Sequence, residues 1–408
     1  MAQFTFSNNT YAGSEVAGFM ASTLLEADSV KRGLWTVIED VKARKIILDV
    51  DDEVVLQNPS GLFVDQNTTA TQNESYLDPV IYEFMKTEQW DNVIKSWESA
   101  SVKPGAMMDY EGVINLTDFL MARYTQKLQI ANERLYYLGK GNVSEVSFSA
   151  AYPGVLSQAE TNGSTYKVSL SGGTLGNMPI LSIALNTGVA TVTVTATSAG
   201  TLKEGDVVTL SNISGSLADA IYGNPNGQSY WIKNVTATTF QLLRNYNEVN
   251  KRRNATFTGS ATVSGTAGTI SYINAANVID VLASVYAQMD QADREQDDFH
   301  LQLPKHVAYA FAQAQANKAT NVLNAFTDSK TYKYLGVNLD MMNHWLGNTI
   351  MGARTSNLFL GVDLLRDTSD LTSVFLGPYT NDQVFKTRAR MSSCTNIKFF
   401  NEIFYLTY

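Results

Sequence analysis

The longest regular pattern of apolar positions in the chain runs from about residue 116 to 138. Apolar residues recur there at spacings of three and four, which places them on one face of a helix. Asn115 is a candidate N-cap with Asp118 three residues further on, and Gly139 can supply the left-handed residue that ends a helix. The sequence therefore predicts a spine helix of roughly 34 Å, on which smaller elements pack. Its apolar face comprises Leu116, Leu120, Tyr124, Leu128, Ala131, Leu135 and Leu138, and its polar side comprises Arg123, Lys127, Asn132 and Glu133.

The step Gly139-Lys140-Gly141 after this helix raises the question of a phosphate loop. A Walker loop needs four residues between its first glycine and Gly-Lys-Ser/Thr, and a helix afterwards. A dinucleotide fingerprint needs a third glycine that opens a helix after a strand. Neither spacing is present, so the glycines indicate the end of a helix and nucleotide binding is not expected.

Two extended stretches on either side of a polar segment predict a long hairpin between residues 44 and 90. The first stretch leads up to a turn cluster at Asn58–Gly61. Each arm has about fifteen residues and would reach roughly 50 Å if extended. Because a two-stranded hairpin is marginal in water by itself, we expect this one to lie on a neighbouring subunit, with Leu62 and Phe63 near its tip.

The composition changes between residues 161 and 272, where short alternating strands rich in Thr, Ser, Gly and Val lie between Gly/Asn turns. This pattern is typical of a small β-sandwich or barrel. Mixed helix and strand patterns return from residue 273, so the β segment interrupts an α+β host in the way that an inserted domain does. If it folds by itself, its core comprises Val168, Leu170, Val192, Val194, Val207, Leu210, Trp231, Val235 and Leu242.

Composition narrows the classes of function. Charged residues make up 17 % of the 408 residues, below the ~25 % of ordinary soluble proteins, which is consistent with surface buried between subunits. The net charge of −9 argues against a groove that wraps nucleic acid. The single cysteine, Cys394, excludes an internal disulfide framework and is expected to pack as a small apolar residue in a strand. No apolar run is long enough to span a membrane, and no signal peptide is recognised.

The candidate reactive groups favour a structural role. The acidic clusters Asp49–Glu53 and Asp293–Asp298 lack the geometry of a calcium loop, so solvated turns or inter-subunit ion pairs are expected. His306 could pair with Asp297 or Asp298, but no nucleophile motif accompanies it. We therefore predict no catalytic residue, no cofactor, no metal site and no enzyme activity.

Several side chains are candidates for contacts between chains. Aromatic residues anchor packing and also mark subunit interfaces. The densest basic run lies in the β segment and is either a solvated loop or a contact for an acidic partner. The candidates for inter-subunit contact are Leu62, Phe63, Trp35, Trp90 and Trp97, and those on the β segment are Lys251, Arg252 and Arg253.

The order of these parts resembles the major capsid protein of tailed bacteriophages, the Hong Kong ninety-seven type fold. In that family the spine helix ends in Gly-x-Gly, followed by a Pro-Gly-aliphatic step. A helix, a strand ending near a proline and a second helix come later, then a glycine-containing loop and arginine-bearing final strands. The matching positions are Gly139, Gly141, Pro153, Gly154, Val155, Asn277–Met289, Phe299–Pro304, Lys305–Ala314, Gly336, Arg388 and Arg390.

The resemblance implies an α+β fold with an additional all-β domain that is immunoglobulin-like or a small barrel. It covers roughly residues 40–160 and 273–408. The implied parts are an N-terminal arm (1–43), an extended loop (44–90), a peripheral domain with the spine helix (91–160), the inserted β domain (161–272), an axial domain (273–372) and return strands of the peripheral domain (373–408).

The resemblance also implies a function. The chain would be a virion shell subunit that assembles in the bacterial host cytoplasm into hexameric and pentameric capsomers around double-stranded DNA, without sequence-specific binding. Portal and auxiliary or decoration proteins would be partners, and scaffolding would be a separate protein. No lysine lies between Lys45 and Lys86, so the covalent cross-link of some family members is not expected. An encapsulin-type compartment and a glycan-binding surface protein built on the β domain remain the alternatives.

Overall fold

The computed structural model describes residues 9–11, 21–51, 71–89, 116–141, 151–168, 170, 175–186, 189–194, 202–213, 228–245, 262–264, 268–317, 331–342, 348–363, 371–375 and 384–408. The chain divides into two compact units. The first comprises Met1–Thr161 and Thr355–Phe399, and the second comprises Asn162–Arg354 and Phe400–Tyr408. Among the described helices, none is long and apolar enough to cross a membrane.

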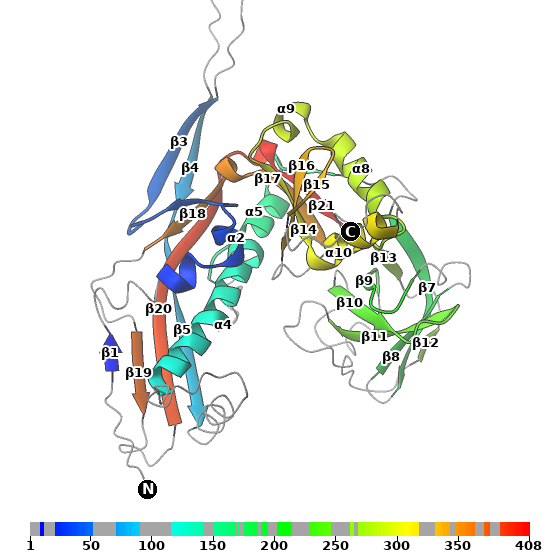
Figure 1. Ribbon diagram of the computed structural model, residues 1–408, viewed down its shortest axis with the longest axis horizontal. Helices are drawn as coiled ribbons and strands as arrows, with labels where there is room; N and C mark the ends of the chain where they lie inside the picture. The colour runs from blue at the N-terminus through cyan, green and yellow to red at the C-terminus, as the bar shows by residue number, and fades with distance from the viewer. Residues whose placement is uncertain are drawn as a thin grey trace, which may run out of the picture. The chain divides into compact units, whose positions relative to one another are not determined.

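The first unit is built on a six-stranded sheet around the long strand β20 (Val384–Ile397). Helix α4 (Leu116–Leu138) lies along this sheet, as Figure 1 shows, and the aromatic ring of Phe84 is 5.5 Å from that of Tyr124 between their centroids. The bounds of the spine helix predicted from the sequence are thus confirmed. The strands that pair with β20 are β5 (Val80–Gln89), β18 (Leu358–Val362) and β19 (Leu371–Phe375), and β1 (Asn9–Tyr11) and β2 (Thr36–Ile38) flank β19 and β18.

One face of this sheet is buried and the other is open to solvent. Side chains of a strand point alternately to opposite faces, and in β20 the buried Ala389 and Met391 alternate with the exposed Arg388 and the half-buried Arg390. On the predicted polar side of α4, Asn132 and Glu133 are nevertheless buried, at 1 % and 2 % exposed. The reason is tertiary: residues from the segment 21–35 cover that side of the helix.

The predicted hairpin is present as an antiparallel ribbon. Strand β3 (Lys45–Asp51) pairs with β4 (Thr71–Leu77) from Lys45 opposite Leu77 to Asp51 opposite Thr71. The expected returning arm is divided, because β5 leaves the ribbon and pairs with β20 instead. Pro79 lies between β4 and β5, where its missing N–H and fixed φ interrupt a ladder.

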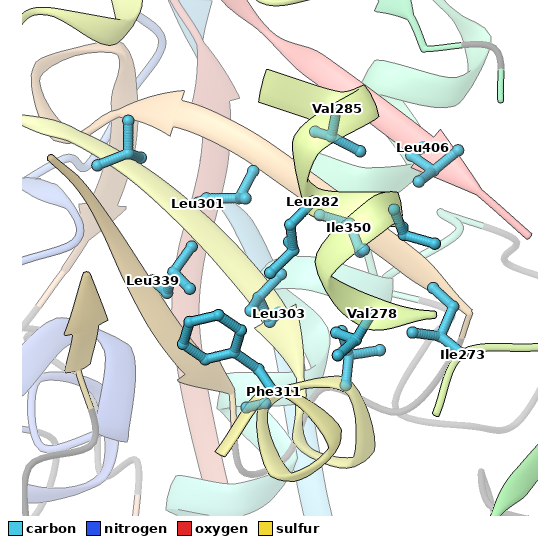
Figure 2. Close-up of a cluster of buried hydrophobic side chains, with 14 of the residues drawn as sticks. Ile273, Val278, Leu282, Val285, Leu301, Leu303, Phe311, Leu339, Ile350 and Leu406 are labelled. Atoms are coloured by element: carbon cyan, nitrogen blue, oxygen red, sulfur yellow. The ribbon is translucent and has the colours of Figure 1, made fainter. Parts of the chain in front are cut away.

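A second six-stranded sheet, here called the mixed sheet, forms part of the second unit, in the order β15-β16-β14-β17-β21-β6. Helices α8 (Val278–Gln288) and α10 (Lys305–Asn317) place their buried faces in its core, where Figure 2 shows Leu282, Leu303 and Phe311 in one cluster. This confirms the predicted helix–strand–helix order. The strands are β6 (Tyr166–Lys167), β14 (Phe299–Pro304), β15 (Thr331–Tyr334), β16 (Val337–Met342), β17 (Thr349–Arg354) and β21 (Phe404–Thr407).

The remaining strands of the second unit form a closed barrel. All their pairings are antiparallel, and the ring runs β7-β13-β9-β10-β11-β8 and back to β7, with β12 beside β7. Of the expected sandwich or barrel, the structure therefore has the barrel (green in Figure 1). Its strands are β7 (Gly176–Asn186), β8 (Val189–Val194), β9 (Val207–Ser211), β10 (Gln228–Lys233), β11 (Thr239–Asn245), β12 (Thr262–Ser264) and β13 (Thr269–Tyr272).

The barrel fills its interior with its own side chains, among them Ile180, Phe240 and Ile270. Val192, Val194, Leu210 and Leu242 belong to this core as predicted, and Val235 packs against it. Val168 and Leu170 were assigned wrongly, because they pack in the core of the mixed sheet. Trp231 alternates with the inward-facing Tyr230 and Ile232 and is only partly buried. Val207 is buried but lies outside the cluster.

Two strands lie in a different unit from the one that the sequence suggested. β18 was placed in the axial segment 273–372, yet it pairs with β20 and β2 in the first unit. β21 was placed with the return strands 373–408, yet it pairs with β17 and β6 in the second unit. In both cases long-range strand pairing, which leaves no local mark in the sequence, decides the location.

Candidate assembly surfaces

The end of the spine helix is a close backbone crossing. The Gly154 N–H donates to the Gly139 carbonyl at 2.7 Å, and Lys140 forms a bridge with Pro153. A Cβ on Gly154 would lie 2.6 Å from the Tyr137 carbonyl oxygen, and a Cβ on Gly139 would overlap the Tyr152 carbonyl oxygen. The two glycines are therefore required by close approach. The residue with positive φ is Gly141 (64°), not Gly139 as expected.

Trp35 is buried inside the subunit rather than displayed on it. Its side chain is 5 % exposed, and its ring lies edge-on to Tyr136 and Tyr137, with centroids 6.0 and 5.2 Å away. The indole N–H donates to the Ser29 hydroxyl at 2.9 Å. These contacts agree with the packing-anchor reading of Trp35, and contact with another subunit remains only a prediction.

The β3–β4 ribbon is anchored at one end and open along its side. Ile47 packs beside the small cluster of Val41, Leu77, Phe359 and Cys394. Ile46, on the opposite face of the strand, is 52 % exposed. Among the described residues, β3 and β4 pair only with each other. In the part of the chain that the structure describes, the ribbon therefore leaves the apolar side chain of Ile46 open to solvent.

The open face of the first unit's sheet combines cations with exposed apolar side chains. Arg388 and Arg390 both donate to Glu83 Oε1 at 2.6 Å, and these hydrogen bonds lower the pKa of Glu83. Ile81 and Met85 flank Glu83 on the same strand face and are 54 % and 68 % exposed. Exposed ion pairs contribute little to stability, so these two contacts add little to the stability of the fold.

Cys394 lies in β20 and packs as the sequence predicted. It is 4 % exposed, and a Cβ on Gly361 opposite it would lie 2.7 Å from its sulfur. Burial raises the pKa of the thiol to about 12. A protonated, covered thiol is a poor nucleophile, so Cys394 has a packing role.

The histidine positions do not assemble into the catalytic pair that was considered. The His306 Nε2 atom lies 2.5 Å from the Tyr408 hydroxyl, and burial lowers the pKa of His306 to about 3. Asp298 binds Arg354 instead, at 3.1 Å. His300 lies 2.5 Å from Asp340 on the neighbouring parallel strand.

The remaining candidates divide between described and undescribed residues. Within the described part of the chain, no group of three His, Cys, Asp or Glu side chains could hold a metal ion. Leu62, Phe63, Trp90, Trp97, Lys251, Arg252 and Arg253 lie outside the described residues.

Sequence reasoning missed two polar arrangements. Glu133 of α4 binds Ser29, 104 residues away, and Glu83 binds Arg388, 305 residues away. The only available signal for the first was a carboxylate in a helix that becomes apolar toward its end. The alternating arginines of β20 marked an open strand face but not their partner.

Comparison with known proteins gives similarity in structure only. No family model and no curated protein matches the chain. The fold is similar to a chain of the satellite phage P4 procapsid, with 8 % identity, a TM-score of 0.47, and 100 % of this chain and 93 % of that chain covered. It is also similar to the capsid of cyanophage A-1(L), with 11 % identity, a TM-score of 0.42, and 98 % and 96 % covered.

A third similar structure is the virus-like particle from Pyrococcus furiosus, with 8 % identity, a TM-score of 0.40, and 97 % of this chain and 98 % of that chain covered. The chain itself has a mixed helix-and-strand fold. Superposition at these TM-scores is loose, so the chain's own elements carry the functional argument.

Proposed function

We propose that this chain is a shell subunit of the tailed-bacteriophage major capsid type, which assembles into hexameric and pentameric capsomers around packaged double-stranded DNA. The observation that carries the proposal is the β3–β4 ribbon. It is a two-stranded sheet, with Ile46 open to solvent. Because such a ribbon is marginal by itself, a neighbouring subunit is the natural partner for its uncovered face.

The glycine crossing supports the same proposal. Gly139 and Gly154 match the family's Gly-x-Gly and Pro-Gly-aliphatic positions, and each is required here by close approach to a backbone carbonyl. The two glycines of the motif therefore allow the backbone crossing at the end of the spine helix. In the proposed assignment, the first unit is the peripheral domain and the mixed sheet of the second unit is the axial domain.

The barrel is proposed to be an inserted domain on the outer face of the shell. Its core is separate from that of the mixed sheet. Its first and last strand residues, Gly176 and Tyr272, are cross-strand partners, and domain insertion is tolerated where both ends lie close together. Such a domain would decorate the surface or receive an auxiliary protein, while separate scaffold and portal proteins would complete the head.

Electron microscopy of the purified chain, alone and with its phage assembly proteins, tests the proposal. Closed shells are expected from the intact chain. A variant lacking residues 58–72 should remain folded by circular dichroism but make no stable shells. A chain that stays monomeric at high concentration with all assembly proteins present would contradict the proposal.

The contents of the shell separate the alternatives. Double-stranded DNA inside particles from infected cells supports a capsid, whereas an enclosed enzyme identifies an encapsulin-type compartment. Glycan binding by the isolated barrel, with no particles from the full chain, would favour a surface protein.

A further inference from the structure

Helix α4 holds residues 21–35, here called the docked segment, through a row of polar side chains. The three donors are spaced three and four residues apart, so they share one face of the helix. Each donates to a backbone carbonyl, so the three hydrogen bonds hold the backbone of the docked segment, and Gln129 Nε2 also donates to the Glu26 carboxylate at 3.2 Å. The pairs are Gln129 Nε2 to Ser22 O at 2.8 Å, Asn132 Nδ2 to Thr23 O at 3.0 Å, and Tyr136 Oη to Leu24 O at 3.0 Å.

Glu133 is the carboxylate within this row. Its Oε2 atom accepts the Ser29 N–H at 3.2 Å and the Ser29 hydroxyl at 2.8 Å, and that hydroxyl accepts the Trp35 indole N–H. Helix α2 (Asp28–Lys31) follows Ala27, which makes no side-chain cap. Glu133 therefore caps a helix of the docked segment from another part of the chain.

Glu133 is isolated from solvent and lacks a direct cationic partner among the described contacts. Its side chain is 2 % exposed, and burial raises its pKa to about 7. The Ser29 hydrogen bonds and Arg32 lower this pKa, and Asp28 raises it. Arg32 binds Asp28 at 3.5 Å. Tyr136 of α4 also interacts electrostatically with Glu133.

We propose that Glu133 is a protonation-sensitive latch, and that its neutral carboxyl holds the docked segment more firmly than its carboxylate does. The direction follows from linkage. The pKa of Glu133 is raised above its ordinary value of 4.5 in the docked state, so docking and proton uptake favour each other. The added stability is fully present below pH 4.5 and is lost as the pH rises through about 7. Between pH 8.5 and 6, docking should strengthen about tenfold.

Hydrogen–deuterium exchange of the full chain tests the latch. After correction for the intrinsic pH dependence of exchange, protection of backbone amides in residues 21–35 should rise about tenfold between pH 8.5 and 6. Glu133→Gln keeps the acceptor and the size of the side chain, so its protection should not vary over this range. An exposed control, Glu295→Gln, should retain the wild-type response. A wild-type profile in Glu133→Gln, or an unvarying profile in the wild type, overturns the proposal.

A second variant keeps the test independent of how well Glu133→Gln folds. The Ser29 hydroxyl stabilises the carboxylate through its hydrogen bond. Ser29→Ala should therefore move the midpoint of the protection change to higher pH, which a purely structural role of Ser29 would not do. An unchanged midpoint also overturns the latch. Because exchange is read in unassembled chains, neither result depends on whether the protein forms shells.

Discussion

Gly176 and Tyr272 lie opposite each other on the neighbouring strands β7 and β13, as the first and last strand residues of the barrel. A Cβ at position 176 would overlap the Tyr272 ring, so glycine is required for this approach. The chain therefore enters and leaves the barrel at one point. This relationship gives the boundaries for removing the barrel, and they are narrower than the segment 161–272 inferred from composition.

Removing residues 177–271 with a short Gly/Ser bridge should leave both six-stranded sheets folded. A second deletion of residues 163–270 provides the comparison. It also removes β6 and Val168, which belong to the mixed sheet and its core, so it should cost at least about 2 kcal/mol more. Denaturant unfolding monitored by circular dichroism measures the difference. Equal stability of the two deletions, or no folded product from the narrower one, would contradict the boundary.

Gly154→Ala should destabilise the first unit by about 1–3 kcal/mol, because its Cβ would lie 2.6 Å from the Tyr137 carbonyl oxygen. The matched control is Gly163→Ala, since a Cβ there would have nothing within 4 Å. That variant should stay within about 0.5 kcal/mol of the wild type. Urea unfolding provides both values. A neutral Gly154→Ala would show that the crossing can relax.

Ile46→Ser should separate assembly from folding. Ile46 is 52 % exposed, so its loss should change the stability of the isolated subunit by less than about 0.5 kcal/mol while it weakens shells. Ile47→Ser is the counterpart, because Ile47 packs against the cluster that contains Leu77 and Cys394, and it should lower subunit stability. Thermal melts of subunits and of assembled particles compare the two. The proposed role of the ribbon fails if Ile46→Ser shells melt like wild-type shells.

His306 should make the fold sensitive to acid. Burial lowers its pKa from 6.5 to about 3. Between these two pH values, His306 binds a proton in the unfolded chain but stays neutral in the folded chain. Its stabilising contribution is present above pH 6.5 and is lost as the pH falls from there toward 3. Between pH 7 and 5, the wild type should lose about 2 kcal/mol relative to His306→Gln. Guanidinium unfolding at both pH values tests this, and parallel pH dependence in the two proteins would rule it out.

The sequence by itself determined the elements whose signal is local. The spacing of apolar positions in residues 116–138 predicted α4, because a helix repeats every 3.6 residues wherever it packs. The alternation and turns of residues 161–272 predicted a β barrel or sandwich for a similar reason. The glycines at 139 and 154 were recognised by their order, although the sequence suggested the wrong conformation for Gly139.

Only the tertiary structure decided which distant segments meet. β5 pairs with β20 and not with β3 of the ribbon, and β21 belongs to the second unit rather than the first. Val168 packs in the core of the mixed sheet, and Glu133, from the predicted polar side of α4, is a buried cap for α2. Strand pairing and burial depend on partners hundreds of residues away. Side-chain pattern within one segment shows which face is apolar, but it carries no record of what covers that face.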